Sequence, residues 1–138
     1  MISLYEFIKA KDVRMNKYPL TEVELGKMES LLSVKFGPQV KEFLLKYAYL
    51  RYKTVEICGI NSLQQEKSRM VTQTLYVHQY FPQTMGLVVF SEYGEGNYCL
   101  ADENDGVYLL DTELETLTKV NMCVFDFIVQ MFLKEDEA

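Results

Sequence analysis

Three short apolar segments in the second half of the chain lie close together, and this spacing constrains the fold more than any other feature. Residues 87–90, 97–100 and 107–111 are rich in Val, Leu, Tyr and Phe, and glycine-bearing turns join them. A parallel pair of strands needs a long crossover connection, so strands joined this closely must be antiparallel. The sequence therefore predicts an antiparallel meander, which a further strand over 116–120 would extend.

Helical signals precede and follow this meander. Capping boxes of the form S/T-x-x-E begin at Ser3 and Thr21, and Pro38 suits the first turn of a third helix. Apolar residues at the spacing i, i+3, i+4 and i+7 follow Pro38 and recur from Val124 to Met131, which is typical of a buried helix face. These patterns predict helices on both sides of the sheet region in the sequence.

The segment between the early helices and the meander is predicted as one strand and one helix. Residues 54–60 are rich in β-branched and alternating apolar positions, which indicates a strand. Polar residues from Asn61 to about Gln79 indicate an exposed helix, which Pro82 would close. Helices, then a meander, then a helix describe an α+β fold.

The size and composition of the chain favour one globular unit. The chain has 138 residues, of which 49% are hydrophobic and 25% charged, as in ordinary globular domains. No apolar run approaches the ~20 residues that span a bilayer, and the first residues lack the basic region of a secretory signal. We expect a single cytoplasmic domain over 1–138, with its core at about 20–133 and an acidic tail at 134–138.

Charge is distributed unevenly along the chain. Residues 1–69 carry 12 basic and 8 acidic side chains, whereas residues 70–118 carry eight carboxylates and no lysine or arginine. Direct binding to nucleic acid depends on basic side chains that neutralise phosphates, so this class of partner is disfavoured. A stretch of one sign attracts cationic protein partners, although acidic residues can equally serve only to keep loops soluble.

The candidate catalytic and metal-binding residues fit ordinary structural roles better than reactive ones. A cysteine–histidine nucleophile would have to use His78, the only histidine, and no carboxylate lies nearby in sequence to orient it. The three cysteines show no CxxC spacing and lie among apolar neighbours, so we expect buried free thiols. The calcium-like segment 102–106 lacks two ligands, because Ala101 and Thr112 occupy the first and last loop positions. We therefore expect no catalytic site, no metal and no cofactor.

Several segments, taken in order, resemble the SUKH superfamily of bacterial toxin-immunity proteins and fungal cell-wall-synthesis regulators. The resemblance rests on residues 36–47, 55–59, 88–108 and 124–128, which include a proline-led helix, a strand, a Gly-Asn turn and a Gly-Val-Tyr run. It implies a non-enzymatic binding domain, which in many cases neutralises a toxin. Many such toxins are basic nucleases or related enzymes that act on nucleic acids.

The acidic stretch and this resemblance lead to one functional hypothesis. The chain is predicted to be an immunity protein that occludes a cationic toxin domain, with a nuclease as one candidate. The alternative is a regulatory scaffold that binds a signalling or cell-wall-synthesis protein. The predicted site includes Tyr93, because a tyrosine combines apolar area with a polar hydroxyl and this one lies in a turn between two glutamates. The predicted partner-binding residues are Glu92, Tyr93, Glu95, Asp102, Glu103 and Asp105.

Overall fold

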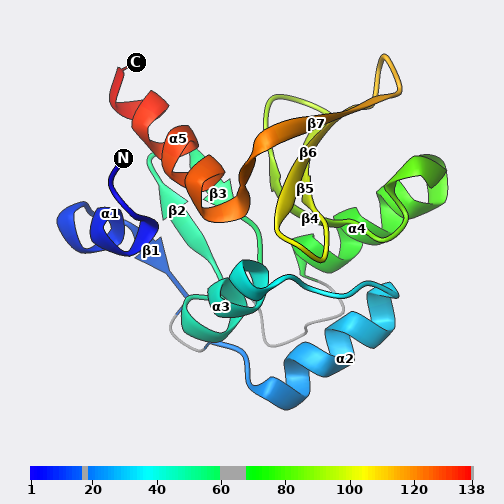
Figure 1. The fold of residues 1–138 in the computed structure, drawn as a ribbon, viewed down its shortest axis with the longest axis horizontal. Coiled ribbons are helices and arrows are strands. Elements are labelled where there is room, and N and C mark those ends of the chain that lie inside the picture. The colour runs from blue at the N-terminus through cyan, green and yellow to red at the C-terminus, as the bar shows by residue number, and fades with distance from the viewer. Residues whose placement is uncertain (17–18, 60–67, 138) are drawn as a thin grey trace.

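A computed structural model describes residues 1–16, 19–59 and 68–137 of the chain (Figure 1). Over these residues the fold contains five α-helices, one short 3-10 helix and seven strands. The strands form one sheet in the order β1-β2-β3-β4-β5-β6-β7, and every neighbouring pair is antiparallel. The predicted α+β class and the antiparallel meander are therefore confirmed.

The elements follow the predicted order. The first half of the chain contains α1 (Leu4–Ala10), β1 (Arg14–Met15), α2 (Glu22–Leu32), α3 (Pro38–Lys46), β2 (Leu50–Tyr52) and β3 (Val55–Ile57). The second half contains α4 (Arg69–Tyr80), η2 (Pro82–Thr84), β4 (Val88–Glu92), β5 (Asn97–Ala101), β6 (Gly106–Asp111), β7 (Thr116–Cys123) and α5 (Val124–Glu137).

The helix starts agree with the caps expected from the sequence. The Ser3 hydroxyl accepts a hydrogen bond from the Glu6 amide at 3.1 Å, at the start of α1. At the start of α2, the Thr21 hydroxyl accepts from the Glu24 amide, and the Glu24 carboxylate accepts from the Thr21 amide. Each cap satisfies amide groups that have no partner within the first helical turn, so these starts are determined locally.

The sheet separates two hydrophobic clusters. Cys99 and Val107 point to the face covered by α5 and the amino-terminal helices. Their strand neighbours Leu100 and Leu110 point to the opposite face, where they pack with Val77 of α4. This alternation follows from the two-residue period of a strand. Figure 1 accordingly shows α4 and α5 on opposite sides of β4–β6.

Two features differ from the sequence prediction. The first is that strands β1 and β2 were not predicted. Residues 61–67 of the predicted polar helix lie outside the described residues. The acidic segment is no free tail, because α5 continues to Glu137. Asp136 accepts hydrogen bonds from the Tyr52 hydroxyl at 2.5 Å and from Lys53 at 2.8 Å, and these contacts hold the end of α5 against the β2–β3 turn. In the part of the chain that the structure describes, no helix is both long and apolar enough to cross a membrane.

Candidate functional site

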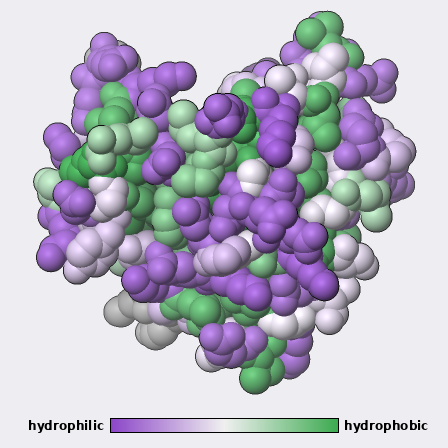
Figure 2. All heavy atoms as spheres, in the orientation of Figure 1, coloured by the Kyte–Doolittle hydropathy of each residue, from purple (hydrophilic) through white to green (hydrophobic). Residues whose placement is uncertain are grey.

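A groove between α5 and the sheet is lined mainly by apolar side chains. It has a volume of about 390 Å³. Figure 2 shows a hollow at the upper edge of the molecule, between two projections that Figure 1 identifies as the end of α5 and the β6–β7 turn. We call this opening the α5 groove, and its lining residues are Val55, Tyr93, Cys99, Leu109, Phe127, Met131, Lys134 and Glu135.

The β4–β5 turn places Tyr93 in the groove. Gly94 and Gly96 have φ angles of 63° and 75°, a left-handed conformation that glycine adopts without steric cost. The Tyr93 amide donates to the Asn97 carbonyl at 2.8 Å and closes the turn. Burial raises the pKa of the Tyr93 phenol, and Cys99 and Asp111 add to this effect. Tyr93 is therefore a neutral, half-buried side chain that presents both apolar area and a hydroxyl to the groove.

The floor of the groove is apolar and chemically unreactive. Leu109 and Val55 come from the sheet, and Phe127 and Met131 come from α5. Cys99 is fully buried, and this burial raises the pKa of its thiol to about 12. A thiol with such a pKa is almost entirely protonated at neutral pH, so it contributes apolar surface rather than a nucleophile.

Carboxylates gather at the end of the sheet where Tyr93 lines the groove, because of the strand register. Asn97 pairs with Asp111, so the β4–β5 and β6–β7 turns lie at the same end of the sheet. The Thr112 hydroxyl donates to the Gly96 carbonyl at 2.6 Å and ties the two turns together. Both turns belong to the stretch that contains no lysine or arginine. We call the carboxylates at this end of the sheet the acidic rim, which consists of Glu95, Asp111, Glu113 and Glu115.

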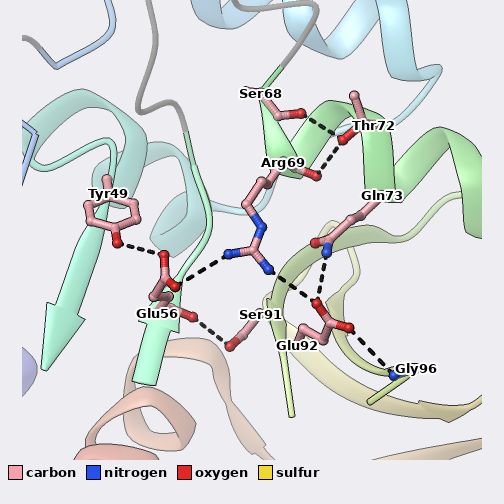
Figure 3. Close-up of polar contacts among 9 residues, drawn as sticks. All are labelled: Tyr49, Glu56, Ser68, Arg69, Thr72, Gln73, Ser91, Glu92 and Gly96. Carbon is pink, nitrogen blue, oxygen red and sulfur yellow. Dashed lines mark hydrogen bonds and ion pairs between the residues drawn. The ribbon is translucent and has the colours of Figure 1, made fainter. Parts of the chain in front are cut away.

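Glu92, the first predicted site residue, is used by the fold (Figure 3). Its carboxylate accepts hydrogen bonds from Arg69 and Gln73, each at 3.1 Å. Arg69 also pairs with Glu56 at 3.4 Å, and the Tyr49 hydroxyl donates to Glu56 at 2.6 Å. Burial, followed by the Glu56 carboxylate, raises the pKa of Tyr49 to about 12. This network joins the start of α4 to β3 and β4, so Glu92 acts mainly within the protein.

Three of the predicted acids, Asp102, Glu103 and Asp105, lie at the opposite end of β5. Asp102 shapes the β5–β6 turn, because its carboxylate accepts from the Asn104 and Gly106 amides at 2.8 Å and from the Tyr108 hydroxyl at 3.1 Å. Glu103 is exposed. Both residues line a broad hollow of about 630 Å³ beside α2. This hollow is separated from the acidic rim by the length of β5, about 16 Å for five residues.

Asp105 is buried and caps a distant helix. Its side chain accepts from the Gln39 amide at 3.0 Å and from the Val40 amide at 3.3 Å, at the start of α3. Gln39 in turn accepts from the Phe125 amide at 2.8 Å with its side-chain oxygen, at the start of α5. Asp105 is only 6% exposed, so its carboxylate is unavailable to a partner. The structure thus does not bring the six predicted residues together on one face, and only Tyr93 and Glu95 belong to the α5 groove and its rim.

Sequence reasoning missed most of the groove. Phe127 and Met131 were assigned to the buried face of the last helix, yet both are only half-buried and line the opening. Glu113 and Glu115 belong to the acidic stretch but are not among the predicted site residues. The sequence pattern that could have predicted this clustering of carboxylates is the pair of hairpin turns. Two turns separated by two antiparallel strands lie at the same end of a meander.

The cysteines and the histidine, which are the candidate nucleophiles, lie in buried or half-buried positions. Burial raises the pKa of the Cys58 thiol to about 11. His78 is half-buried on α4, and its Nε2 atom lies 2.7 Å from the Leu87 carbonyl oxygen. The expectation of buried free thiols is confirmed for Cys58 and Cys99, while Cys123 is half-buried and also free. Among the described residues, no group of three or more metal-ligating side chains is assembled.

These observations define an α+β domain built on a seven-stranded antiparallel meander, with an apolar groove that has an acidic rim. The chain belongs to the SUKH superfamily: the family model SUKH_5, described as SMI1-KNR4 cell-wall, matches residues 1–133. The match begins at the first residue, so it extends beyond the core predicted at about 20–133 and includes α1 and β1. A comparison with the curated proteins finds no match.

Proposed function

We propose that this chain is a non-enzymatic cytoplasmic immunity protein, which binds a cognate cationic toxin domain in the α5 groove and blocks it by occlusion. The observation that carries the proposal is the juxtaposition of an apolar groove with an acidic rim that comes from a stretch without basic residues. Membership of the SUKH superfamily supports a protein-binding role. Nucleases are the toxin class that fits best, because their phosphate-binding clefts are cationic.

The two parts of the site would contribute differently to binding. The apolar floor, with Phe127 and Met131, would bury apolar side chains of the partner and so slow its dissociation. The exposed carboxylates Glu95, Glu113 and Glu115 would attract a cationic partner over a longer range and speed its association. Reduced, protonated thiols at Cys58 and Cys99 fit both the cytoplasm and a function without nucleophilic chemistry.

Charge reversal tests the electrostatic part. The partner is first identified by pull-down from the source cells and by expressing the product of the adjacent reading frame. Association rates are then measured for the wild type, Glu95→Lys and Glu103→Lys at low and high salt. Both side chains are exposed, but they lie at opposite ends of β5. We expect Glu95→Lys to slow association severalfold at low salt, and Glu103→Lys to leave it near the wild-type rate.

A substitution on α5 tests the apolar part. Met131→Glu places a charge in the groove, and we expect faster dissociation of the toxin with little change in the melting temperature, since Met131 is half-buried. Leu31→Glu, a matched change at a 48% exposed position on α2, serves as the control. Equal toxin affinity in Glu95→Lys, Met131→Glu and the wild type would remove the groove from the proposal.

The description of the matching family favours a second candidate function. That description names the cell wall, which suits a regulatory adaptor that binds a cell-wall-synthesis or signalling protein. Such an adaptor would use the same groove, so the substitutions above do not separate the two candidates. The captured partner does: a toxin encoded beside the gene supports immunity, and a cell-wall-synthesis or signalling protein supports the adaptor.

A further inference from the structure

Two arginines lie directly opposite each other on β1 and β2, at one edge of the sheet. The antiparallel register of these strands pairs Arg14 with Arg51. Side chains of such a pair point to the same face, with Cβ atoms about 4.5–5.5 Å apart. Leu50 and Tyr52, the strand neighbours of Arg51, are buried, so Arg51 points away from the core. Both arginines are exposed, and the register therefore places two positive charges close together at the surface.

The two arginines have no carboxylate partner. None of the ion pairs within the described part of the chain includes Arg14 or Arg51. The Arg51 Nε group donates to the Lys53 carbonyl at 3.1 Å. Glu56 lies opposite Arg51 on β3, but its carboxylate pairs with Arg69 at 3.4 Å (Figure 3). Like charges directly opposite each other destabilise a strand pair, so the pairing of β1 with β2 does not itself favour two arginines.

The two arginines line an opening with an excess of positive charge. Its volume is about 460 Å³, and we call it the β1–β2 pocket. Its lining residues are Asp12, Arg14, Arg51, Tyr52 and Lys53. The carboxylate of Asp136 accepts from Lys53 at 2.8 Å, but it also pairs with Lys11 at 3.7 Å. In the described part of the chain, the pocket and this ion-pair cluster thus contain four basic side chains and two carboxylates, which leaves two positive charges in excess.

The chemistry of the β1–β2 pocket fits a phosphate group. A phosphate dianion matches the two positive charges in excess. A guanidinium presents its N–H donors in a planar fork, which can bind two phosphate oxygens at once. Two guanidiniums without carboxylate partners can therefore share one phosphate, and its charge relieves the repulsion between them. A carboxylate carries one charge and two oxygens, so it would satisfy fewer of these donors.

We propose that the β1–β2 pocket is an anion-binding site, in which Arg14 and Arg51 hold the phosphate group of a small ligand. Inorganic phosphate and a phosphomonoester share this chemistry. The pocket has no lining residue in common with the α5 groove. It can therefore be tested without a protein partner, and failure of either proposal leaves the other intact.

The test uses the full-length protein and follows the Nε–Hε signals of its three arginines by proton–nitrogen NMR. Inorganic phosphate, phenyl phosphate and acetate are titrated separately at constant ionic strength. We expect saturable shifts of Arg14 and Arg51 with both phosphates and no saturable shift with acetate. Arg69 is the internal control, because its guanidinium already pairs with Glu56 and Glu92. Tighter binding of phenyl phosphate would identify a phosphomonoester as the ligand, and binding no tighter than that of phosphate would identify the free anion.

Substitution of one arginine should change binding and stability in opposite directions. Arg14→Gln should weaken phosphate binding about tenfold, because one of the two charged donors is lost. In phosphate-free buffer the same variant should melt about 1–3 °C above the wild type, since the repulsion between the paired positions is removed. Phosphate should raise the melting temperature of the wild type more than that of Arg14→Gln.

Lys27→Gln is the matched control, because it also removes one positive charge. Lys27 is exposed on α2 and lines neither the β1–β2 pocket nor the α5 groove, so this variant should keep the wild-type response to phosphate. Equal shifts of Arg69, equal binding of acetate, or an equal loss in Lys27→Gln would overturn the inference. A lower melting temperature of Arg14→Gln in phosphate-free buffer would also overturn it, because the fold itself would then require this side chain.

Discussion

Substitution of Asp105 provides the sharpest test of how the sheet is joined to the helices. The N-cap position of α3 is Gly37, which has no side chain to accept from the first amides. Asp105 takes over this role from the β5–β6 turn, with hydrogen bonds of 3.0 Å to the Gln39 amide and 3.3 Å to the Val40 amide. The approach is so close that a Cβ atom on Gly37 would lie 2.3 Å from the Asp105 carboxylate.

The magnitude follows from three contributions. Loss of an N-cap side chain costs about 0.5–2 kcal/mol, and loss of a negative charge at a helix N-terminus costs about 0.3–1 kcal/mol. Asp105 also has a φ of 63°, a conformation that alanine tolerates less well than aspartate or asparagine. We therefore expect Asp105→Ala to lower the free energy of unfolding by about 2–3 kcal/mol. Asp105→Asn keeps the backbone preference and one acceptor oxygen, so its cost should be about 1 kcal/mol.

The assay is urea denaturation of the full chain, followed by far-ultraviolet circular dichroism and evaluated at constant m-value. Glu103→Ala is the control, because Glu103 lies in the same turn, is exposed and should change stability by less than about 0.5 kcal/mol. The reasoning fails if Asp105→Ala is no more destabilising than Glu103→Ala, or if Asp105→Asn costs as much as Asp105→Ala.

Three further predictions concern other polar and titratable groups. Gln39→Ala removes the side-chain acceptor for the Phe125 amide and should cost about 1 kcal/mol in urea denaturation, with Gln39→Glu retaining most of the stability. Hydrogen bonds from Lys53 and Tyr52 lower the pKa of Asp136. The ionised carboxylate therefore stabilises the protein above its unfolded pKa, and this stabilisation is lost as pH falls through the folded pKa. The difference in stability between the wild type and Asp136→Asn should shrink below about pH 4. The buried Cys99 should react with a thiol reagent only at the rate of local or global unfolding, whereas the half-buried Cys123 should react first, as peptide mapping after limited labelling would show.

Much of the fold could be predicted because its signals are local. The capping groups at Ser3 and Thr21 lie within three residues of the amides they satisfy, and the helices begin where these pairs indicate. The meander was predictable because the short connections between its apolar segments exclude parallel pairing. Strands β1 and β2 were missed, since two or three residues carry no periodicity and become strands only through pairing such as Met15 with Leu50.

The candidate site was only partly predictable, because a carboxylate's role depends on which distant group it meets. Glu92 and Glu95 stand three positions apart, yet Glu92 pairs with Arg69, 23 residues away, while Glu95 remains exposed. Asp105 finds its partner Gln39 across 66 residues, and this contact turns a predicted surface group into a buried cap. No local sequence pattern distinguishes the roles of Glu92, Glu95 and Asp105.

The amino-acid sequence by itself determined the α+β class, the antiparallel meander and the absence of basic residues from 70 to 118, since each depends on residue type and short-range spacing. Tertiary structure alone decided which carboxylates stay free at the end of the sheet and which stabilise the protein. It also formed the α5 groove, by packing Phe127 and Met131 near Tyr93. The role of each carboxylate and the formation of the groove depend on strand register and on contacts between residues far apart in the chain. Composition and periodicity do not encode these contacts.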